Sequence, residues 1–181
     1  TPIAVPAPIA APTPAITPTP IAAPTPAITP TPMPTVIPAV LTGLDSFGRS
    51  PSVAIGSDGL GLIAFHDERT GYIKVAHCKN NNCTSTAIST VEIGEANPKP
   101  SITIGSDGLG LIVWTHYGTI KLAHCRNVDC SLSDTSSHPN LQAQNVSVTI
   151  SSNGRGLISY RGNNGDLKIA HCDAVYCSDA S

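Results

Sequence analysis

The sequence has few aromatic residues and few charges, and its charges are unevenly distributed. Of the 181 residues, 4% are aromatic and 12% are charged, and no charged side chain precedes Asp45. Ten basic and 12 acidic residues give a formal net charge of −2, and the basic residues are scattered. This pattern does not form the basic patch that binds nucleic acid. No apolar run is long enough to span a bilayer. We therefore expect no nucleic-acid partner and no membrane span.

The sequence also lacks a residue set typical of an active site. A glycosidase needs two carboxylates in one cleft, and the candidates all come from one part of the chain: Asp67, Glu68, Glu92 and Glu95. Asp67 and Glu68 are adjacent and have no copy in the later repeats, which favours a solvated loop. We therefore predict no enzymatic activity, no catalytic residues and no cofactor.

Proline is concentrated at the start of the chain, where 13 of the 17 prolines fall within residues 1–38. Residues 8–19 (PIAAPTPAITPT) recur identically as residues 20–31. Proline fixes φ and lacks an N–H, which excludes a helix or an interior strand. Polyproline II or disorder remains. We predict an extended tail over residues 1–38, about 120 Å long as polyproline II, and a globular part over residues 39–181.

The tail has two candidate roles. One is a semi-rigid linker or stalk. The other is an O-glycosylated stalk, because threonine beside proline and alanine is a mucin-like composition. The candidate glycosylation sites are Thr13, Thr17, Thr19, Thr25, Thr29, Thr31 and Thr35.

Three repeats occupy the globular part. The sequence GSDGLGLI occurs at residues 56–63 and 105–112, and a looser copy occurs at residues 152–158. Each copy leads to a segment that ends in Ala-His-Cys, and the three His-Cys pairs are 47 residues apart. A fixed period of this length indicates a repeat architecture. The repeats cover about residues 51–97, 98–145 and 146–181.

Each repeat has the pattern of short antiparallel strands. In the first repeat, apolar residues alternate over residues 52–55, which is the strand period. A Ser-Asp-Gly turn, suited to a tight hairpin, leads to a strand that ends on an aromatic residue. The third strand ends in Ala-His-Cys. The fourth is predicted at residues 86–93 in repeat 1 and weakly near residues 141–144 in repeat 2, and it is missing in repeat 3. The predicted fold is all-β, with three four-stranded units.

Four short antiparallel strands at this period resemble a blade of a β-propeller. The Pro-Ser-x-x-Ile-Gly-Ser-Asp-Gly opening and the Ala-His-Cys-x4-Cys end resemble those of bacterial secreted β-propeller-type repeat proteins, over about residues 51–177. With the Pro/Thr-rich tail, this resemblance implies an extracellular fibril subunit. Propellers typically have about four to eight blades. Three blades are too few to close a ring, so we expect the array to be open or to be completed by another chain.

One strand-like segment, residues 36–44, precedes the first repeat. It is the candidate strand for assembly, because the third repeat has no fourth strand and its open edge can accept one from another chain. Pro38 restricts the segment to an edge position. The residues predicted to pair are Val36, Ile37, Ala39, Val40 and Leu41.

Six cysteines form three Cys-x4-Cys pairs, one in each repeat. A zinc site with histidine ligands is the alternative, but His77 and Cys78 are consecutive in a strand and point to opposite faces. We therefore predict no metal and three local disulfides: Cys78–Cys83, Cys125–Cys130 and Cys172–Cys177. Disulfides at this density indicate an oxidising, extracellular compartment.

His77, His124 and His171 occupy one repeated position, which makes them candidates for catalysis or for a metal. A repeated position is more often a packing position, so we predict half-buried histidines hydrogen-bonded to the backbone. Three histidines converging on one axis would need a closed threefold arrangement, which the sequence does not indicate.

These features together predict an extracellular structural protein that forms a homopolymeric surface fibril, assembled through its N-terminal segment and glycosylated on its tail. Its partners are then other copies of itself and covalent glycans. The alternative is a stalked carbohydrate-binding, propeller-like module. A lectin of that kind should keep a set of pocket residues in every repeat, whereas the residues that recur here belong to turns and core.

Overall fold

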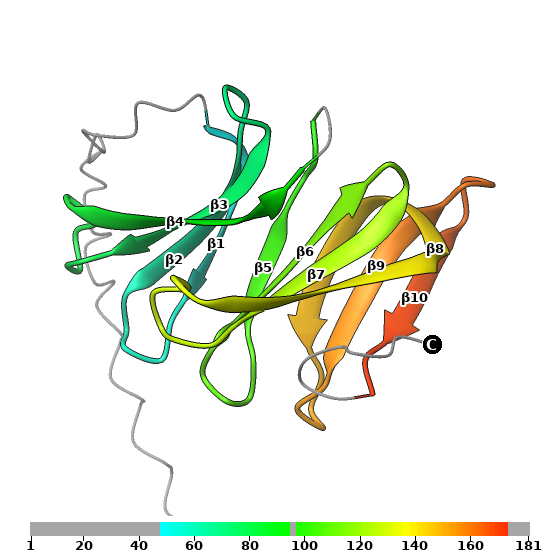
Figure 1. Ribbon diagram of the computed structural model, residues 1–181. Helices are drawn as coiled ribbons and strands as arrows, with labels where there is room; N and C mark the ends of the chain where they lie inside the picture. The colour runs from blue at the N-terminus through cyan, green and yellow to red at the C-terminus, as the bar shows by residue number, and fades with distance from the viewer. Residues whose placement is uncertain (1–47, 95–96, 174–181) are drawn as a thin grey trace, which may run out of the picture. The chain divides into compact units, whose positions relative to one another are not determined.

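The computed structural model describes residues 48–94 and 97–173, and all regular structure in these ranges is β-strand (Figure 1). The strands belong to one compact unit, Ile37–Ser181. They are β1 (Gly48–Ile55), β2 (Gly61–Asp67), β3 (Tyr72–Cys78), β4 (Thr86–Ile93), β5 (Ser101–Ile104), β6 (Gly110–His116), β7 (Thr119–Cys125), β8 (Ser133–Ile150), β9 (Gly156–Gly162) and β10 (Leu167–His171). The described ranges contain no helix that could cross a membrane. The predicted all-β class is confirmed.

The strands form two antiparallel sheets. Strands β1 to β4 make a four-stranded meander, and β5 to β10 make a six-stranded meander. The long strand β8 serves two repeats, because its first part pairs with β7 and its second part pairs with β9. Repeat 1 therefore comprises β1 to β4, repeat 2 runs from β5 into the first part of β8, and repeat 3 runs from the second part of β8 to β10.

The fourth strand of repeat 2 begins earlier than predicted. Pairing with β7 starts at Ser133, where the prediction placed the strand near Leu141. The segment that was missed, SDTSSH, is entirely polar and none of it is buried, so it carries no apolar alternation to mark it. Its pairing depends on backbone hydrogen bonds, which any sequence can supply. The predicted boundary between repeats 2 and 3, at residue 145, falls inside this continuous strand.

The repeated Ser-Asp-Gly turns form tight hairpins, as predicted. In repeat 1, the N–H of Gly59 donates to the carbonyl of Gly56 at 3.0 Å, and Gly59 has a φ of 78°. Gly108 and Gly154 repeat this conformation, with φ values of 82° and 79°. Glycine adopts this left-handed backbone without a steric penalty, which explains why it recurs in all three turns.

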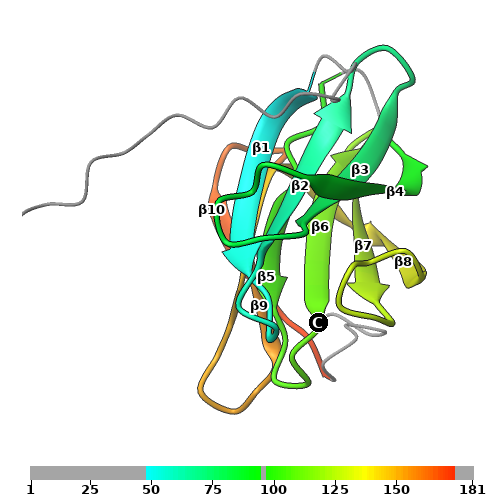
Figure 2. The ribbon, with the colours of Figure 1, turned by 90° about the vertical axis from the view of Figure 1, so that its left-hand side faces the viewer.

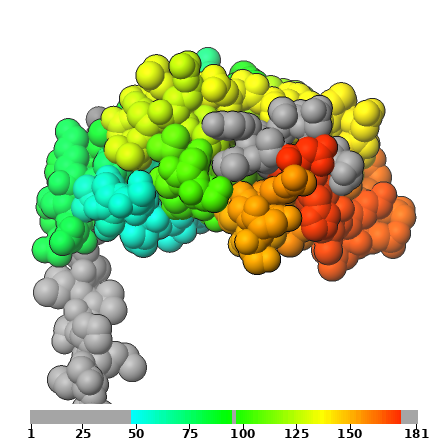
Figure 3. Space-filling model, turned by 90° about the horizontal axis from the view of Figure 1, so that it is seen from below, coloured from blue at the N-terminus to red at the C-terminus, as the bar shows by residue number. Residues whose placement is uncertain are grey.

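Successive repeats pack face to face, and repeat 2 is buried on both sides. On β6, Ile112 and Trp114 belong to the core shared with repeat 1, whereas Leu111 and Val113 belong to the core shared with repeat 3. All four side chains are fully buried. We call the side of a repeat that faces the preceding repeat its front face, and the opposite side its back face. Figure 3 shows the repeats in chain order, from cyan and green to orange and red.

Candidate functional sites: the seams between repeats, the end faces and a polar groove

The same serine contact joins successive repeats at both seams. The hydroxyl of Ser52 accepts a hydrogen bond from the backbone N–H of Ile102 at 3.1 Å. One repeat later, the hydroxyl of Ser101 accepts from the backbone N–H of Val148, also at 3.1 Å. Each repeat therefore offers a serine acceptor at its back and a backbone donor at its front, which fixes the register of the next repeat.

The turns make a second periodic contact. The hydroxyl of Ser106 donates to the carbonyl of Gly154 at 3.2 Å. A Cβ on Gly154 would lie 3.1 Å from that hydroxyl, and a Cβ on Gly108 would lie 3.0 Å from the Cβ of Ser57. The serine of one turn thus packs closely against the glycine of the next turn. Gly59, the equivalent glycine of repeat 1, has open space around its Cβ position.

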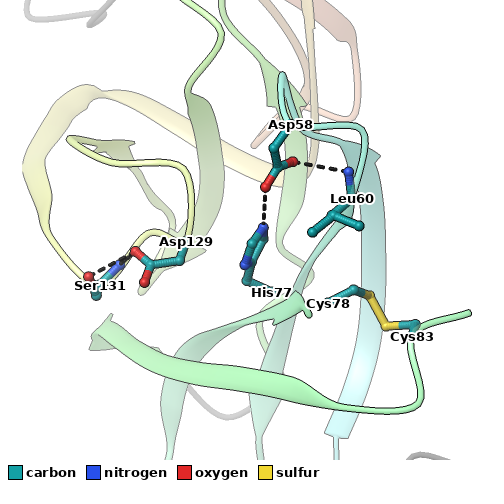
Figure 4. A network of polar contacts seen from close by, with 7 residues as sticks. All are labelled: Asp58, Leu60, His77, Cys78, Cys83, Asp129 and Ser131. Carbon is teal, nitrogen blue, oxygen red and sulfur yellow. Dashed lines mark hydrogen bonds and ion pairs between the residues drawn. A yellow bond between two sulfur atoms is a disulfide. The ribbon is translucent and has the colours of Figure 1, made fainter. Parts of the chain in front are cut away.

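The repeated histidines pair with the aspartates of the Ser-Asp-Gly turns. In repeat 1, His77 Nε2 lies 2.8 Å from Asp58 Oδ2 (Figure 4). The pair His124 and Asp107 of repeat 2 has the same distance. The backbone N–H of Leu60 donates to the Asp58 carboxylate at 3.0 Å. That bond, together with His77, lowers the pKa of Asp58. Each pair ties the Ala-His-Cys strand to the turn of its own repeat.

These pairs correct the prediction that the histidines bond to the backbone, because in the first two repeats the partner is a carboxylate. In repeat 3, Asn153 replaces the aspartate, and His171 is exposed. The sequence held a signal for the pairing, since aspartate and histidine recur together in repeats 1 and 2 and the aspartate is lost in repeat 3. In repeats 1 and 2 the histidines therefore link a strand to a turn through a carboxylate.

A loop of repeat 2 brings a further carboxylate near His77. Asp129 accepts hydrogen bonds from the backbone N–H and the hydroxyl of Ser131 (Figure 4). These bonds lower the pKa of Asp129, and His77 contributes a smaller attraction. The loop that carries Asp129 in repeat 2 thus lies near the His77–Asp58 pair of repeat 1, on the other side of the first seam.

Asp67 is buried rather than solvated, so the predicted loop is wrong for this residue. Its side chain has no exposed surface, and it accepts a hydrogen bond from Lys74 Nζ at 2.5 Å. Burial alone would raise the pKa of Asp67, but the hydrogen bond from Lys74 and further bonds outweigh it and lower the pKa to about 2. Glu68 points outward and pairs with Arg49 at the surface.

The other acidic candidates do not complete a glycosidase pair within the described ranges. Glu92 forms an ion pair with Lys121 across the first seam. Glu95 lies outside the described residues. Asp67 and Glu92 each form an ion pair with a lysine, which links two strands in the first case and two repeats in the second.

The first two predicted disulfides are present, Cys78–Cys83 and Cys125–Cys130. Cys172 is disulfide-bonded as well, whereas Cys177 lies outside the described residues. Within the described ranges no cysteine is free, and no cluster of three or more candidate ligands that could hold a metal occurs. Two disulfides are compatible with a secreted protein.

The back face of repeat 3 exposes apolar side chains at positions that are buried in the other repeats. Leu167 and Ile169 of β10 are 79% and 57% exposed. Ile120 and Leu122 occupy the same motif positions in repeat 2 and are 0% and 1% exposed, because repeat 3 covers them. No described strand covers the back of repeat 3.

The front face of repeat 1 shows the complementary feature. Val53 and Ile55 of β1 are both 64% exposed. Figure 2 shows β1, the strand that carries them, in cyan. The equivalent residues of repeat 2 are Ile102, which is 6% exposed, and Ile104, which packs against the core shared with repeat 1. The two ends of the array thus present the two halves of the seam that occurs twice inside it.

A polar groove lies across the edges of repeats 2 and 3. Its volume is about 550 Å³. The lining comes from the segment before β5, the end of β6, the turn between β6 and β7, the middle of β8 and the turn after β9: Asn97, Lys99, Thr115, Tyr117, Gly118, Ala143, Gln144, Asn145 and Asn163. Sequence analysis did not identify this site, because most of its lining residues lie outside the recurring motifs; Gly118, which recurs as Gly71 and Gly165, is an exception.

The predicted assembly strand, residues 36–44, lies outside the described residues. So do the seven threonines predicted to carry glycans and the predicted tail as a whole.

Comparisons with known proteins bear on the fold. No family model and no curated protein matches the sequence. Among solved structures, a β-1,3-galactosidase of glycoside hydrolase family GH43 has a TM-score of 0.54 at 9% identity, over 75% of this chain and 31% of that one. An α-L-arabinofuranosidase from Lactobacillus brevis has a TM-score of 0.51 at 14% identity, over 75% of this chain and 52% of that one. The chain thus spans about half or less of these proteins. At such identities the likeness shows the fold alone, which is all-β and propeller-like.

Proposed function

We propose that this chain is an extracellular structural protein whose copies assemble head to tail into a homopolymeric surface fibril. One observation carries the proposal: equivalent motif positions are buried at both internal seams and exposed at both ends. Ile169 is 57% exposed, whereas its equivalent Leu122 is 1% exposed, and Val53 is 64% exposed, whereas Ile102 is 6% exposed. Exposed apolar surface of this kind favours association.

The shape of the two end faces favours a second copy of the chain as the partner. The back of repeat 3 carries Ser147, the equivalent of the two seam serines, and the front of repeat 1 carries the backbone N–H of Val53, the equivalent of the two donors. The turns match as well. Ser152 of repeat 3 is the equivalent of Ser57 and Ser106, and Gly59 of repeat 1 is the equivalent of Gly108 and Gly154. A second copy can therefore continue the seam with the same contacts.

The propeller-like fold allows two products of head-to-tail assembly, a ring and a filament. Each repeat corresponds to one blade in this proposal, with the third blade lacking its fourth strand among the described residues. A head-to-tail contact that does not close produces a filament, and one that closes produces a ring. We propose the open filament, in which the back face of one copy meets the front face of the next without closing a ring.

In this proposal residues 36–44 supply a pairing strand, and the tail carries glycans. The edge of β10 has no partner strand among the described residues, so residues 36–44 of a neighbouring copy are the proposed strand for that edge. The threonines of the tail are the proposed glycan sites, and sugars there would cover its isoleucine and alanine side chains. The disulfides support the extracellular location.

Negative-stain electron microscopy of the full-length, disulfide-bonded protein tests the proposal. We expect fibres of uniform width that shorten on dilution, because association is governed by mass action. Closed rings of two copies would support contact between the two end faces but would contradict a fibril. Particles with the mass of one chain at high concentration, measured by light scattering, would contradict both.

A further inference from the structure

The polar groove has a lining rich in amides and poor in charge. Asn97, Gln144, Asn145 and Asn163 contribute carboxamides, and Lys99 contributes the one charged group. No carboxylate lines the groove among the described residues. Its volume of about 550 Å³ lies within the usual range of small-molecule sites. Such a lining suits a ligand with many hydroxyl groups and without net charge.

Two of the amides are oriented by cations. Lys99 Nζ donates to Asn145 Oδ1 at 3.0 Å, and Arg161 Nη1 donates to Gln144 Oε1 at 3.2 Å. A carboxamide has an oxygen acceptor and an NH₂ donor. Because the cations occupy the oxygens of these two amides, the NH₂ groups remain to donate to a ligand. The groove therefore presents fixed donors without a free negative charge.

An exposed aromatic ring lines the groove. The side chain of Tyr117 is 80% exposed, although it makes an edge contact with His116 at a centroid distance of 4.6 Å. The backbone of Tyr117 has a φ of 50° and is followed by Gly118 with a φ of 79°. This tight turn holds the ring at the surface. The negative face of an aromatic ring attracts the weakly positive C–H groups of a sugar ring.

Unusual backbone conformations gather at the groove. Six described residues other than glycine have a positive φ, and three of them line this site: Asn97, Tyr117 and Asn145, at 76°, 50° and 50°. Such residues are uncommon and cluster at ligand sites, where the surrounding structure maintains them. This clustering is independent of the chemistry of the side chains.

We infer that the groove binds a neutral oligosaccharide. One sugar ring packs on Tyr117, and the amides of Gln144, Asn145 and Asn163 hydrogen-bond to its hydroxyl groups. Because paired carboxylates are lacking in the lining, the site binds the sugar and does not hydrolyse it. The inference does not depend on fibril formation, since repeats 2 and 3 of one chain supply the whole groove.

Isothermal titration calorimetry with the full-length, disulfide-bonded protein tests the site. The probes are neutral hexasaccharides of β-1,4-linked glucose, β-1,4-linked xylose, β-1,3-linked galactose and α-1,5-linked arabinose, with hexagalacturonate as the acidic probe. We expect at least one neutral probe to bind. Tyr117→Ala should then weaken binding about tenfold or more, and Tyr117→Phe, which keeps the ring, only about twofold. Gln144→Ala should weaken binding about threefold to tenfold, as expected for one lost hydrogen bond.

Tyr72→Ala is the matched control, because Tyr72 is an exposed tyrosine of repeat 1 that does not line the groove. It should leave the dissociation constant unchanged. Failure of every neutral probe to bind at millimolar concentration would overturn the inference. Binding of hexagalacturonate alone would also overturn it, and so would a Tyr117→Ala variant that binds as tightly as the parent.

Discussion

The substitution Ile169→Lys is expected to abolish assembly while the chain remains folded. Ile169 is 57% exposed on the back face of repeat 3, so a lysine there reaches water in the single chain and costs little stability. In the assembled state the same position would be covered, as Leu122 is at the internal seam. Burying an unpaired ammonium group costs several kcal/mol, which weakens association by at least about 100-fold.

Leu132→Lys provides the control for Ile169→Lys. Leu132 is 58% exposed, almost the same as Ile169, but it lies after the disulfide loop of repeat 2 and outside both end faces. Sedimentation velocity should show single chains for Ile169→Lys and parent-like assemblies for Leu132→Lys. Assemblies of unchanged size in the Ile169→Lys sample would show that the back face of repeat 3 is not part of the contact between copies.

The second large effect is expected from Asp67→Ala, which should reduce the free energy of unfolding by about 3 kcal/mol. The Asp67 side chain is completely buried, and that of its partner Lys74 is 17% exposed. Removing the carboxylate leaves the lysine poorly solvated and without its partner. Since a domain of this size is stable by only about 5 to 15 kcal/mol, the loss is large. Urea denaturation followed by circular dichroism measures it.

The same pair predicts how stability depends on pH. The pKa of Asp67 falls from 3.8 to about 2 in the folded chain, so the folded state favours the ionised carboxylate. The stabilisation is complete above about pH 4 and is lost as the pH falls through about 2. It amounts to about 2 kcal/mol. The Asp67→Ala variant should lack this part of the acid transition.

Glu68→Ala is the neighbouring control. The Glu68 side chain is 34% exposed, and its partner Arg49 is 58% exposed. A surface ion pair of this kind contributes less than about 1 kcal/mol. If Glu68→Ala and Asp67→Ala cost the same, the buried pair with Lys74 does not have the importance assigned to it.

Strong local patterns made much of the fold predictable from the sequence. The short apolar segment that ends on an aromatic residue in each repeat indicated a strand, and in repeat 2 both faces of that strand, β6, prove to be buried. The glycines of the three turns identified the hairpins, and the Cys-x4-Cys spacing identified the first two disulfides. In each case a few adjacent residues carry the whole signal, so no knowledge of distant contacts was needed.

Contacts between distant segments could not be predicted in the same way. Lys99 and Asn145, which meet at the groove, are 46 residues apart, and neither belongs to a recurring motif. The sequence favours a solvated loop for Asp67, because nothing in it shows that the Lys74 side chain reaches the Asp67 carboxylate. The polar start of β8 was missed because its backbone, and not its side chains, determines its pairing.

An equimolar mixture of two blocked variants tests the central claim most directly. Val53→Lys blocks the front face of repeat 1, and Ile169→Lys blocks the back face of repeat 3. If copies join head to tail, each variant alone is a single chain, because every contact needs one front and one back. The mixture should then form particles with twice the mass of one chain by light scattering, since the one intact front meets the one intact back and growth stops there. Pairing of either variant with itself, or a mixture that contains only single chains, would contradict head-to-tail assembly.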